Sequence, residues 1–300
     1  MAKTPKKQLC FIQISGAPKP ASINTIDLFC NNNEVTLSPI DTYIKRNKSL
    51  LVKLGKFERA QLLDITDTDD RDIYNLLLLG FISNVESYFR YIMRELILID
   101  KISYQTCLEQ SLTYAAAVHH EEKLLPEALL ENCTFISFDN IKSTTKSYLD
   151  VTINKQSIEH KELVESLIKF EELCQLRHCI VHRGGFLGSK NAIKLGIDKH
   201  KSYFEKPIAF NSTFLQEAST ICLNSVRLFN NFLFNTLLHR KIESEKLTIE
   251  WDFRKDKTWF NKYFLIFNSL ELNIEQSNLG LVPHTSISSY EEYRSYYETL

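Results

Sequence analysis

An arginine and two histidines stand close together beyond the middle of the chain, in the string Arg177-His178-Cys179-Ile180-Val181-His182-Arg183-Gly184-Gly185. Arginine carries a fixed positive charge, and histidine titrates near neutral pH. Such a pair is suited to phosphodiester cleavage in RNA, because the guanidinium stabilises the charge that develops on the phosphate while the imidazole transfers a proton. The string therefore predicts a site for metal-independent chemistry on a phosphodiester.

The same string resembles the motif of the HEPN superfamily, which comprises small all-helical domains, many of them metal-independent endoribonucleases. The shared pattern is an arginine, a polar residue, three further positions, a histidine and two glycines. The resemblance implies that Arg177 and His182 are catalytic. His178 stands at the position that is most often asparagine in the family, and it keeps a hydrogen-bonding side chain there.

The resemblance also implies a reaction and a partner. A ribose 2′-hydroxyl attacks the adjacent phosphorus and leaves a 2′,3′-cyclic phosphate and a 5′-hydroxyl, with His182 as general base or acid and with no cofactor or metal ion. Active members form the site from two facing motifs, so this chain, with one motif, needs a homodimer or another HEPN-containing partner. Many such proteins are toxins or effectors of antiphage defence. The alternative is a HEPN bundle that binds nucleotide, RNA or protein without cutting.

Three further charged residues are predicted to support the site. HEPN domains often carry a polar residue of the first helix beside the motif, which implies that Glu86 orients Arg177 or His182 through a charged hydrogen bond. The alternative is an exposed ion pair between Glu86 and Arg90, which are one helical turn apart. Arg183 is expected either to add a phosphate contact or to be solvated.

Two simpler explanations of the motif stay open at this point. The C-terminal end of a helix favours positive charge, so His182 could cap carbonyl groups while Arg177 pairs with a carboxylate. Alternatively, Cys174, His178 and His182 follow one another at four-residue spacing, and two histidines at that spacing form a workable zinc pair. The third ligand would reach the same ion poorly, and the sequence contains no CxxC pair to complete the set.

Amphipathic helices must position these side chains. Apolar residues at three- and four-residue steps predict a helix over residues 70–100, a helical stretch over 103–131, a helix from about 160 to Gly184, and a fourth helix over about 212–240. The two glycines end the third helix, directly after the motif. We therefore expect a mainly α fold, with an HEPN-like bundle of about four helices.

The expected bundle occupies the middle of the chain. We predict a helical domain over residues 66–242, a leader of irregular or mixed α/β structure over residues 1–65, with a strand at Gln8–Ile14, and an aromatic-rich C-terminal extension over residues 243–300. The extension contains both tryptophans and a short closing helix with several tyrosines.

Charge and hydropathy limit which binding partners the sequence suggests. The net charge is −1, so composition as a whole does not indicate nucleic acid. Locally, residues 177–206 contain seven lysines and arginines against Asp198 and Glu205, which predicts an RNA-binding surface or a merely solvated one. No apolar run approaches the ~20 residues of a membrane span, and no secretory signal follows Met1. With seven cysteines that fit reduced thiols, we expect a cytoplasmic protein without a membrane partner.

Overall fold

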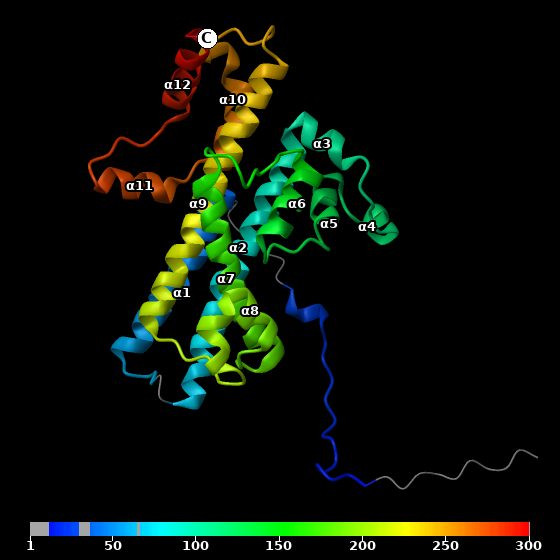
Figure 1. Cartoon of the computed structure of the whole chain (residues 1–300). Helices are drawn as coiled ribbons and strands as arrows, with labels where there is room; N and C mark the ends of the chain where they lie inside the picture. Colours follow the sequence, from blue (N-terminus) through cyan, green and yellow to red (C-terminus); the bar gives the residue numbers. More distant parts are fainter. Residues whose placement is uncertain (1–11, 30–36, 65–66, 300) are drawn as a thin grey trace, which may run out of the picture. The chain divides into compact units, whose positions relative to one another are not determined.

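The computed structural model describes residues 12–29, 37–64 and 67–299, and the chain divides into two units, Met1–Thr36 and Leu37–Leu300. In the first unit the described residues contain one 3₁₀-helix, η1 (Ile26–Leu28). All twelve α-helices seen among the described residues belong to the second unit (Figure 1). The residues that the structure describes form no β-strand. Residues 12–14, the described part of the strand expected at Gln8–Ile14, do not pair with another strand. Residues 8–11 lie outside the described part. The expectation of a mainly α fold is confirmed.

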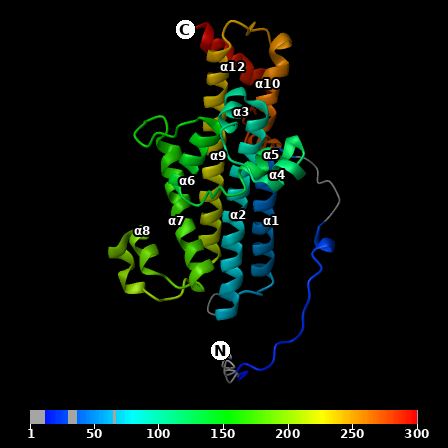
Figure 2. The same cartoon turned by 90° about the vertical axis from the view of Figure 1, so that its right-hand side faces the viewer.

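Four long helices of the second unit lie side by side: α1 (Pro39–Arg59), α2 (Thr68–Ile99), α7 (Lys161–Arg183) and α9 (Ser212–Ser244) (Figure 2). The helix α2 packs against each of the other three. Its most buried residues recur at three- and four-residue steps and form one broad stripe, to which the other three helices pack. These buried residues include Leu78, Phe81, Ile82, Val85, Tyr88, Phe89, Ile92, Met93 and Leu96.

Aromatic rings join three of these helices at the centre of the core. Phe89 of α2 is fully buried, and its ring centroid lies 4.7 Å from that of Phe229 on α9 and 6.4 Å from that of Phe170 on α7. The ring of Phe135 stacks on Phe89 at 5.7 Å. Such contacts combine a large buried apolar area with favourable edge-to-face geometry. The position of α7, and therefore of the motif that it carries, depends on this packing.

The second bundle helix differs from the expectation. Residues 103–131 do not form one long helix but a series of short ones: α3 (Lys101–Cys107), α4 (Tyr114–His119), η2 (Glu122–Leu124) and α5 (Leu125–Leu129). Thr113 caps α4 by accepting a hydrogen bond from the Ala116 N–H, and Pro126 stands in the first turn of α5. Polar and proline positions thus start new helices where the apolar spacing alone predicted continuation. Residues 138–149 form a further helix, α6 (Phe138–Leu149).

The helix α1 takes the fourth place in the bundle. It begins with Ser38 as N-cap, which accepts a hydrogen bond from the Asp41 N–H, followed by Pro39 in the first turn. The sequence analysis assigned this stretch to the leader of residues 1–65. In the structure α1 belongs to the same unit as α2, α7 and α9, which begins at Leu37, while the expected domain bounds stay a prediction.

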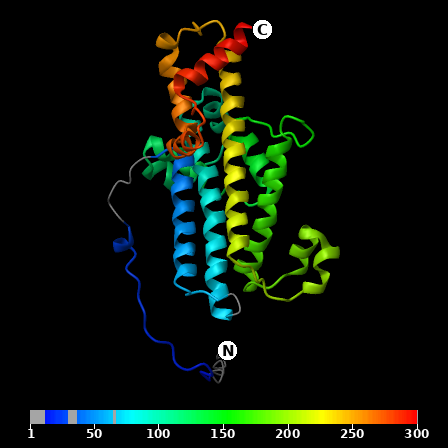
Figure 3. The same cartoon turned by 90° about the vertical axis from the view of Figure 1, so that its left-hand side faces the viewer.

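The C-terminal residues belong to the same unit as the bundle. They form α10 (Phe253–Phe267), α11 (Leu270–Asn278) and α12 (Ser286–Glu298), and α10 and α12 lie at the end of α9 opposite to α8 (Ser189–His200) and the short η3 (Lys201–Tyr203) (Figure 3). Phe260 and Tyr290 are fully buried against each other. The aromatic residues of this segment thus extend the core. No helix in the described part of the chain is long and apolar enough to cross a membrane.

The first prediction concerns this core. Replacing Phe89 with alanine should lower the free energy of unfolding by about 3–5 kcal/mol, because it leaves a cavity between three helices. Urea denaturation measures the change. The matched control is Leu98→Ala on the same helix, where the side chain is 44% exposed and the loss should stay below about 1 kcal/mol. Equal losses in both variants would contradict the central place of Phe89.

Candidate functional site

The motif lies in the last two turns of α7, where two glycines end the helix. Gly184 has φ +60° and Gly185 has φ +85°, a left-handed conformation that glycine adopts without steric cost. The N–H of Gly185 donates to the Cys179 carbonyl at 3.1 Å and closes the helix end. The chain therefore turns away directly after Arg183, and the last side chains of α7 are left at a helix terminus.

The helix α8 is fastened beside these turns. The amide of Asn191 is buried and donates to the carbonyl of Gln175 on α7 at 3.3 Å. Leu187 and Ala192 pack on Cys179 in a small apolar cluster of their own. Backbone hydrogen bonds join residue 187 to residues 205 and 206, and so hold together the two ends of the segment that contains α8 and η3. The lysines of α8 are consequently held next to the motif.

His178 and His182 lie on the same face of α7. Their ring centroids are 4.4 Å apart, the ring planes are inclined by 51°, and both residues are exposed. Partial burial lowers the pKa of His178, and the positive charges of His182 and Arg177 and of Lys194 and Lys190 on α8 lower it further. A neutral imidazole at His178 is thereby favoured, which is the form that accepts a proton.

Arg177 lies on a different side of the helix. Five helical positions correspond to about 140° around the axis at 3.6 residues per turn, so Arg177 and His182 do not share a face. Arg177 is half-buried, and in the described part of the chain its guanidinium makes no hydrogen bond and no ion pair within 4.0 Å. Its charge acts on Glu86 of α2: burial raises the pKa of Glu86, and Arg177 and Arg90 oppose that rise.

The supporting residues are arranged as follows. Glu86 and Arg177 are electrostatic neighbours without a direct ion pair. Arg90 donates to the Cys133 carbonyl at 3.1 Å and forms no close pair with Glu86 within the described ranges. Arg183 forms an ion pair with Glu205, and its side chain packs over Gly188, where a Cβ atom would lie 2.8 Å from the Arg183 Cδ. Arg183 is therefore held by a protein carboxylate.

Together, five side chains form what we call the motif strip: Glu86, Arg177, His178, His182 and Lys190. The structure brings His178 together with His182, and Arg177 next to both Glu86 and His178, but it shows no contact between Arg177 and His182 within one chain. Neither His182 nor Arg177 forms a hydrogen bond or a close ion pair with a carbonyl or carboxylate in the described residues, although His182 lies in the last turn of α7 and Arg177 is an electrostatic neighbour of Glu86.

The zinc alternative finds no matching geometry. Cys174 is buried, and burial raises the pKa of its thiol far above the ordinary range, whereas His178 and His182 are exposed. Among the residues that the structure describes, no group of three or more His, Cys, Asp or Glu side chains is placed to hold a metal ion.

Two contributions were not apparent from the sequence pattern. Lys190 and Lys194 belonged to a general basic run, and only the turn at the glycines and the clamp of α8 place them next to His178. Their four-residue spacing, equal to that of the two histidines, was the available signal. Comparison with protein-family models, with curated proteins and with solved structures gives no match.

The second prediction tests the electrostatics of the strip. His182→Ala and Lys190→Gln should each raise the pKa of His178, because each removes a positive charge that disfavours protonation. Histidine NMR titration of ¹⁵N-labelled protein measures the shift. Lys199→Gln, farther along α8, serves as the control and should leave the His178 pKa where it is. An unchanged pKa in all three variants would mean that burial alone sets it.

Proposed function

We propose that the protein is a metal-independent endoribonuclease of the HEPN type that acts as a homodimer. The observation that carries the proposal is the motif strip: two exposed, adjacent imidazoles and an arginine without a protein partner in the described residues, at the end of a helix where the backbone turns away. Arg177 and Lys190, which form no close ion pair in the described residues, lie near an imidazole that favours its neutral form, and this combination suits an anionic, hydroxyl-bearing substrate such as RNA.

The proposed reaction needs only groups that the strip and the substrate supply. His178, which favours its neutral form, takes the proton of the 2′-hydroxyl, and the 2′-oxygen attacks phosphorus. The bond from phosphorus to the 5′-oxygen breaks, and the 5′-oxygen receives a proton from His182. Arg177 stabilises the additional charge on the phosphate oxygens, and Lys190 attracts the neighbouring phosphate. The products are a 2′,3′-cyclic phosphate and a 5′-hydroxyl.

A dimer would compensate for the separation of Arg177 and His182 around α7, because it brings in a second copy of both residues. Because the two side chains leave the helix about 140° apart, one copy of the strip does not surround a phosphate. Two facing strips would enclose it from both sides, as the HEPN resemblance implies. A role as toxin or antiphage effector rests on that resemblance as well, and it follows from the proposed activity.

The third prediction is an RNA cleavage assay. The wild-type protein should cut mixed RNA in the presence of EDTA and leave cyclic phosphate ends, and Arg177→Ala and His182→Ala should each lower the rate by ~10²–10⁴, because each removes a group that acts on the transition state. His119→Ala, an exposed histidine on α4, is the matched control and should cut at the wild-type rate. Sedimentation velocity on the same samples should give a dimer.

The outcomes separate the alternatives. RNA binding that survives without any cleavage would leave a binding module in place of an enzyme. Cleavage that EDTA abolishes, or that persists in the His182 variant, would locate the activity elsewhere and contradict the proposal.

The fourth prediction concerns Glu86. Burial raises its pKa, so in the folded protein the carboxylate costs stability that is absent below the unfolded pKa of about 4.5 and grows as the pH rises. Glu86→Gln should therefore raise the melting temperature at pH 7 and have less effect at pH 4. If Glu86 also positions Arg177, the same variant should cut RNA more slowly in spite of its greater stability. A faster or unchanged rate would confine Glu86 to a structural role.

A further inference from the structure

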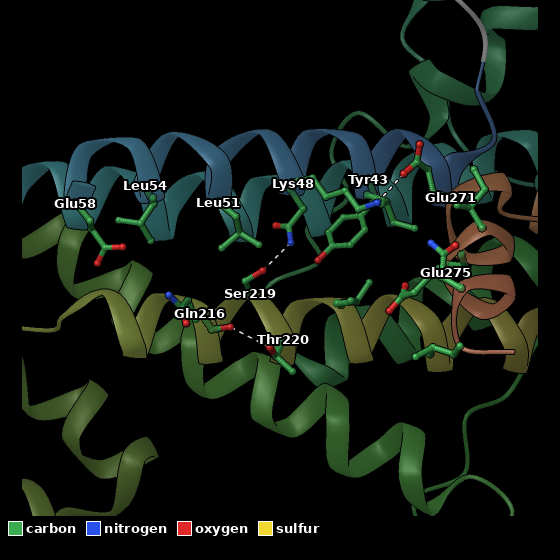
Figure 4. A pocket seen from close by; sticks show the side chains of 18 residues that line it. Tyr43, Lys48, Leu51, Leu54, Glu58, Gln216, Ser219, Thr220, Glu271 and Glu275 are labelled. Atoms are coloured by element: carbon green, nitrogen blue, oxygen red, sulfur yellow. Dashed lines mark hydrogen bonds and ion pairs between the residues drawn. The ribbon is translucent and has the colours of Figure 1, made fainter. Parts of the chain in front are cut away.

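A cleft of about 800 Å³ lies between α1, α9 and α11, and none of its lining residues belongs to the motif strip (Figure 4). Its length follows α1 from Tyr43 to Glu58, with Leu51 and Leu54 between them. This size is typical of ligand sites, which combine apolar walls with a few polar groups. The cleft is therefore a candidate binding site that the proposed ribonuclease activity does not use.

Two buried oxygen atoms in the cleft lack hydrogen-bond partners. The Tyr43 hydroxyl and the Asn47 Oδ1 are both shielded from solvent and unpartnered, although Asn47 donates through its Nδ2 to the Ser219 hydroxyl at 2.7 Å. Tyr43 is 1% exposed and Asn47 5% exposed, and the Tyr43 hydroxyl points from α1 toward α9. Buried polar atoms without a partner are rare and costly. A hydrogen-bond donor in the cleft would satisfy both, because the Asn47 Oδ1 accepts and the Tyr43 hydroxyl can accept as well as donate.

The charges around the cleft indicate a cation. Lys48 is paired with Glu271 at 2.6 Å, and Glu275 is paired with Arg227 at 2.9 Å. Glu58, at the opposite end from Tyr43, is half-buried and forms no ion pair with any described residue. The lining thus has one uncompensated charge, and that charge is negative.

The acceptors stand at both ends of an apolar stretch. Asn47 and Glu58 are eleven positions apart on α1, which corresponds to about 16 Å at 1.5 Å per residue. Ammonium groups donate three hydrogen bonds and accept none, so they match acceptors at both ends. Burial raises the pKa of Tyr43, which keeps the phenol neutral and its oxygen available as an acceptor. An anionic amphiphile would find no free cation here.

The helix α11 closes the cleft at the end where Tyr43 lies. It contains no buried residue of its own, and its partly buried Leu272 packs against the core. Its N-terminus is fixed by buried Asp41, which accepts hydrogen bonds from the Leu270 N–H at 3.0 Å and from the Ser269 hydroxyl. Beyond that point, the exposed pairs of Glu271 and Glu275 connect it to α1 and α9, and exposed pairs stabilise little.

We propose that this cleft binds an elongated aliphatic amine, with ammonium groups at Tyr43 and Asn47 and at Glu58, and with its methylene chain along Leu51 and Leu54. The site is independent of RNA cleavage, because it shares no residue with the motif strip.

The fifth prediction tests the ligand class by calorimetric titration of the full chain. The probes have equal chain length: 1,12-diaminododecane, dodecylamine and dodecanoate, each far below its micellar concentration. The diamine should bind saturably and at least tenfold more tightly than dodecylamine, and dodecanoate should not bind saturably. Equal binding of all three would indicate a nonspecific apolar surface and overturn the proposal, as would the absence of binding by the diamine.

Variants locate the site. Gly55→Phe places a ring in the cleft, where a Cβ atom meets nothing within 4 Å, and should weaken diamine binding at least tenfold without lowering the melting temperature. Glu58→Gln should weaken the diamine to the level of dodecylamine. Tyr43→Phe should weaken both amines while raising the melting temperature, since it removes an unpartnered hydroxyl.

The matched control is Tyr88→Phe. The Tyr88 hydroxyl is buried but donates to the Asn230 Oδ1 at 3.0 Å, so this variant should lower stability and leave amine binding unchanged. Diamine binding of wild-type strength in Gly55→Phe would show that the amine binds elsewhere and would refute the assignment.

Discussion

The burial of α2 is the constraint on which the rest of the structure depends. Its apolar side chains form a broad stripe along the helix, which is stable only when other helices cover it. The helices α1, α7 and α9 do so, and Phe89 is the point at which α2, α7 and α9 meet. Because α7 is held through Phe170, its register is fixed along its length. The side chains on the exposed face of the last turns of α7 are then held at defined positions.

The last turns of α7 carry polar side chains, unlike the preceding turns. Leu163, Leu167, Phe170 and Cys174 face the core, but the next turns carry Arg177, His178 and His182. The glycines after Arg183 end the helix before these groups are covered, and α8 returns with two lysines beside them. The core therefore fixes the position of α7, and the turn that follows it brings cationic side chains next to the two histidines.

The sequence allowed some of this to be predicted and not the rest. The helices α2, α7 and α9 agree with the expected ranges because their apolar periodicity is long and uninterrupted. The helix α1 was not recognised, because the stretch from Lys45 to Arg59 was interpreted by its six lysines and arginines and not by the spacing of its apolar residues. Arg177 and His182 were expected to act together, but a five-residue spacing places them on different faces of one helix. The lysines of α8 become neighbours of the motif only through tertiary packing, which periodicity does not encode.

Some buried polar groups of this protein have hydrogen-bond partners within the fold, and others do not. Asp100 is buried and is fully engaged: it pairs with Arg240, accepts from Tyr263 at 3.0 Å and caps α3 through the Ser103 N–H. Asn230 is likewise satisfied by the Tyr88 hydroxyl and the Phe267 carbonyl. Four buried side-chain atoms in the described residues have no hydrogen-bond partner: the Tyr43 hydroxyl, Asn47 Oδ1, Arg240 Nε and Trp259 Nε1. Of these residues, Tyr43 and Asn47 line the cleft between α1 and α9. Since Tyr43 and Asn47 share one cleft, the proposed amine would supply hydrogen-bond donors to both of their unpartnered oxygens.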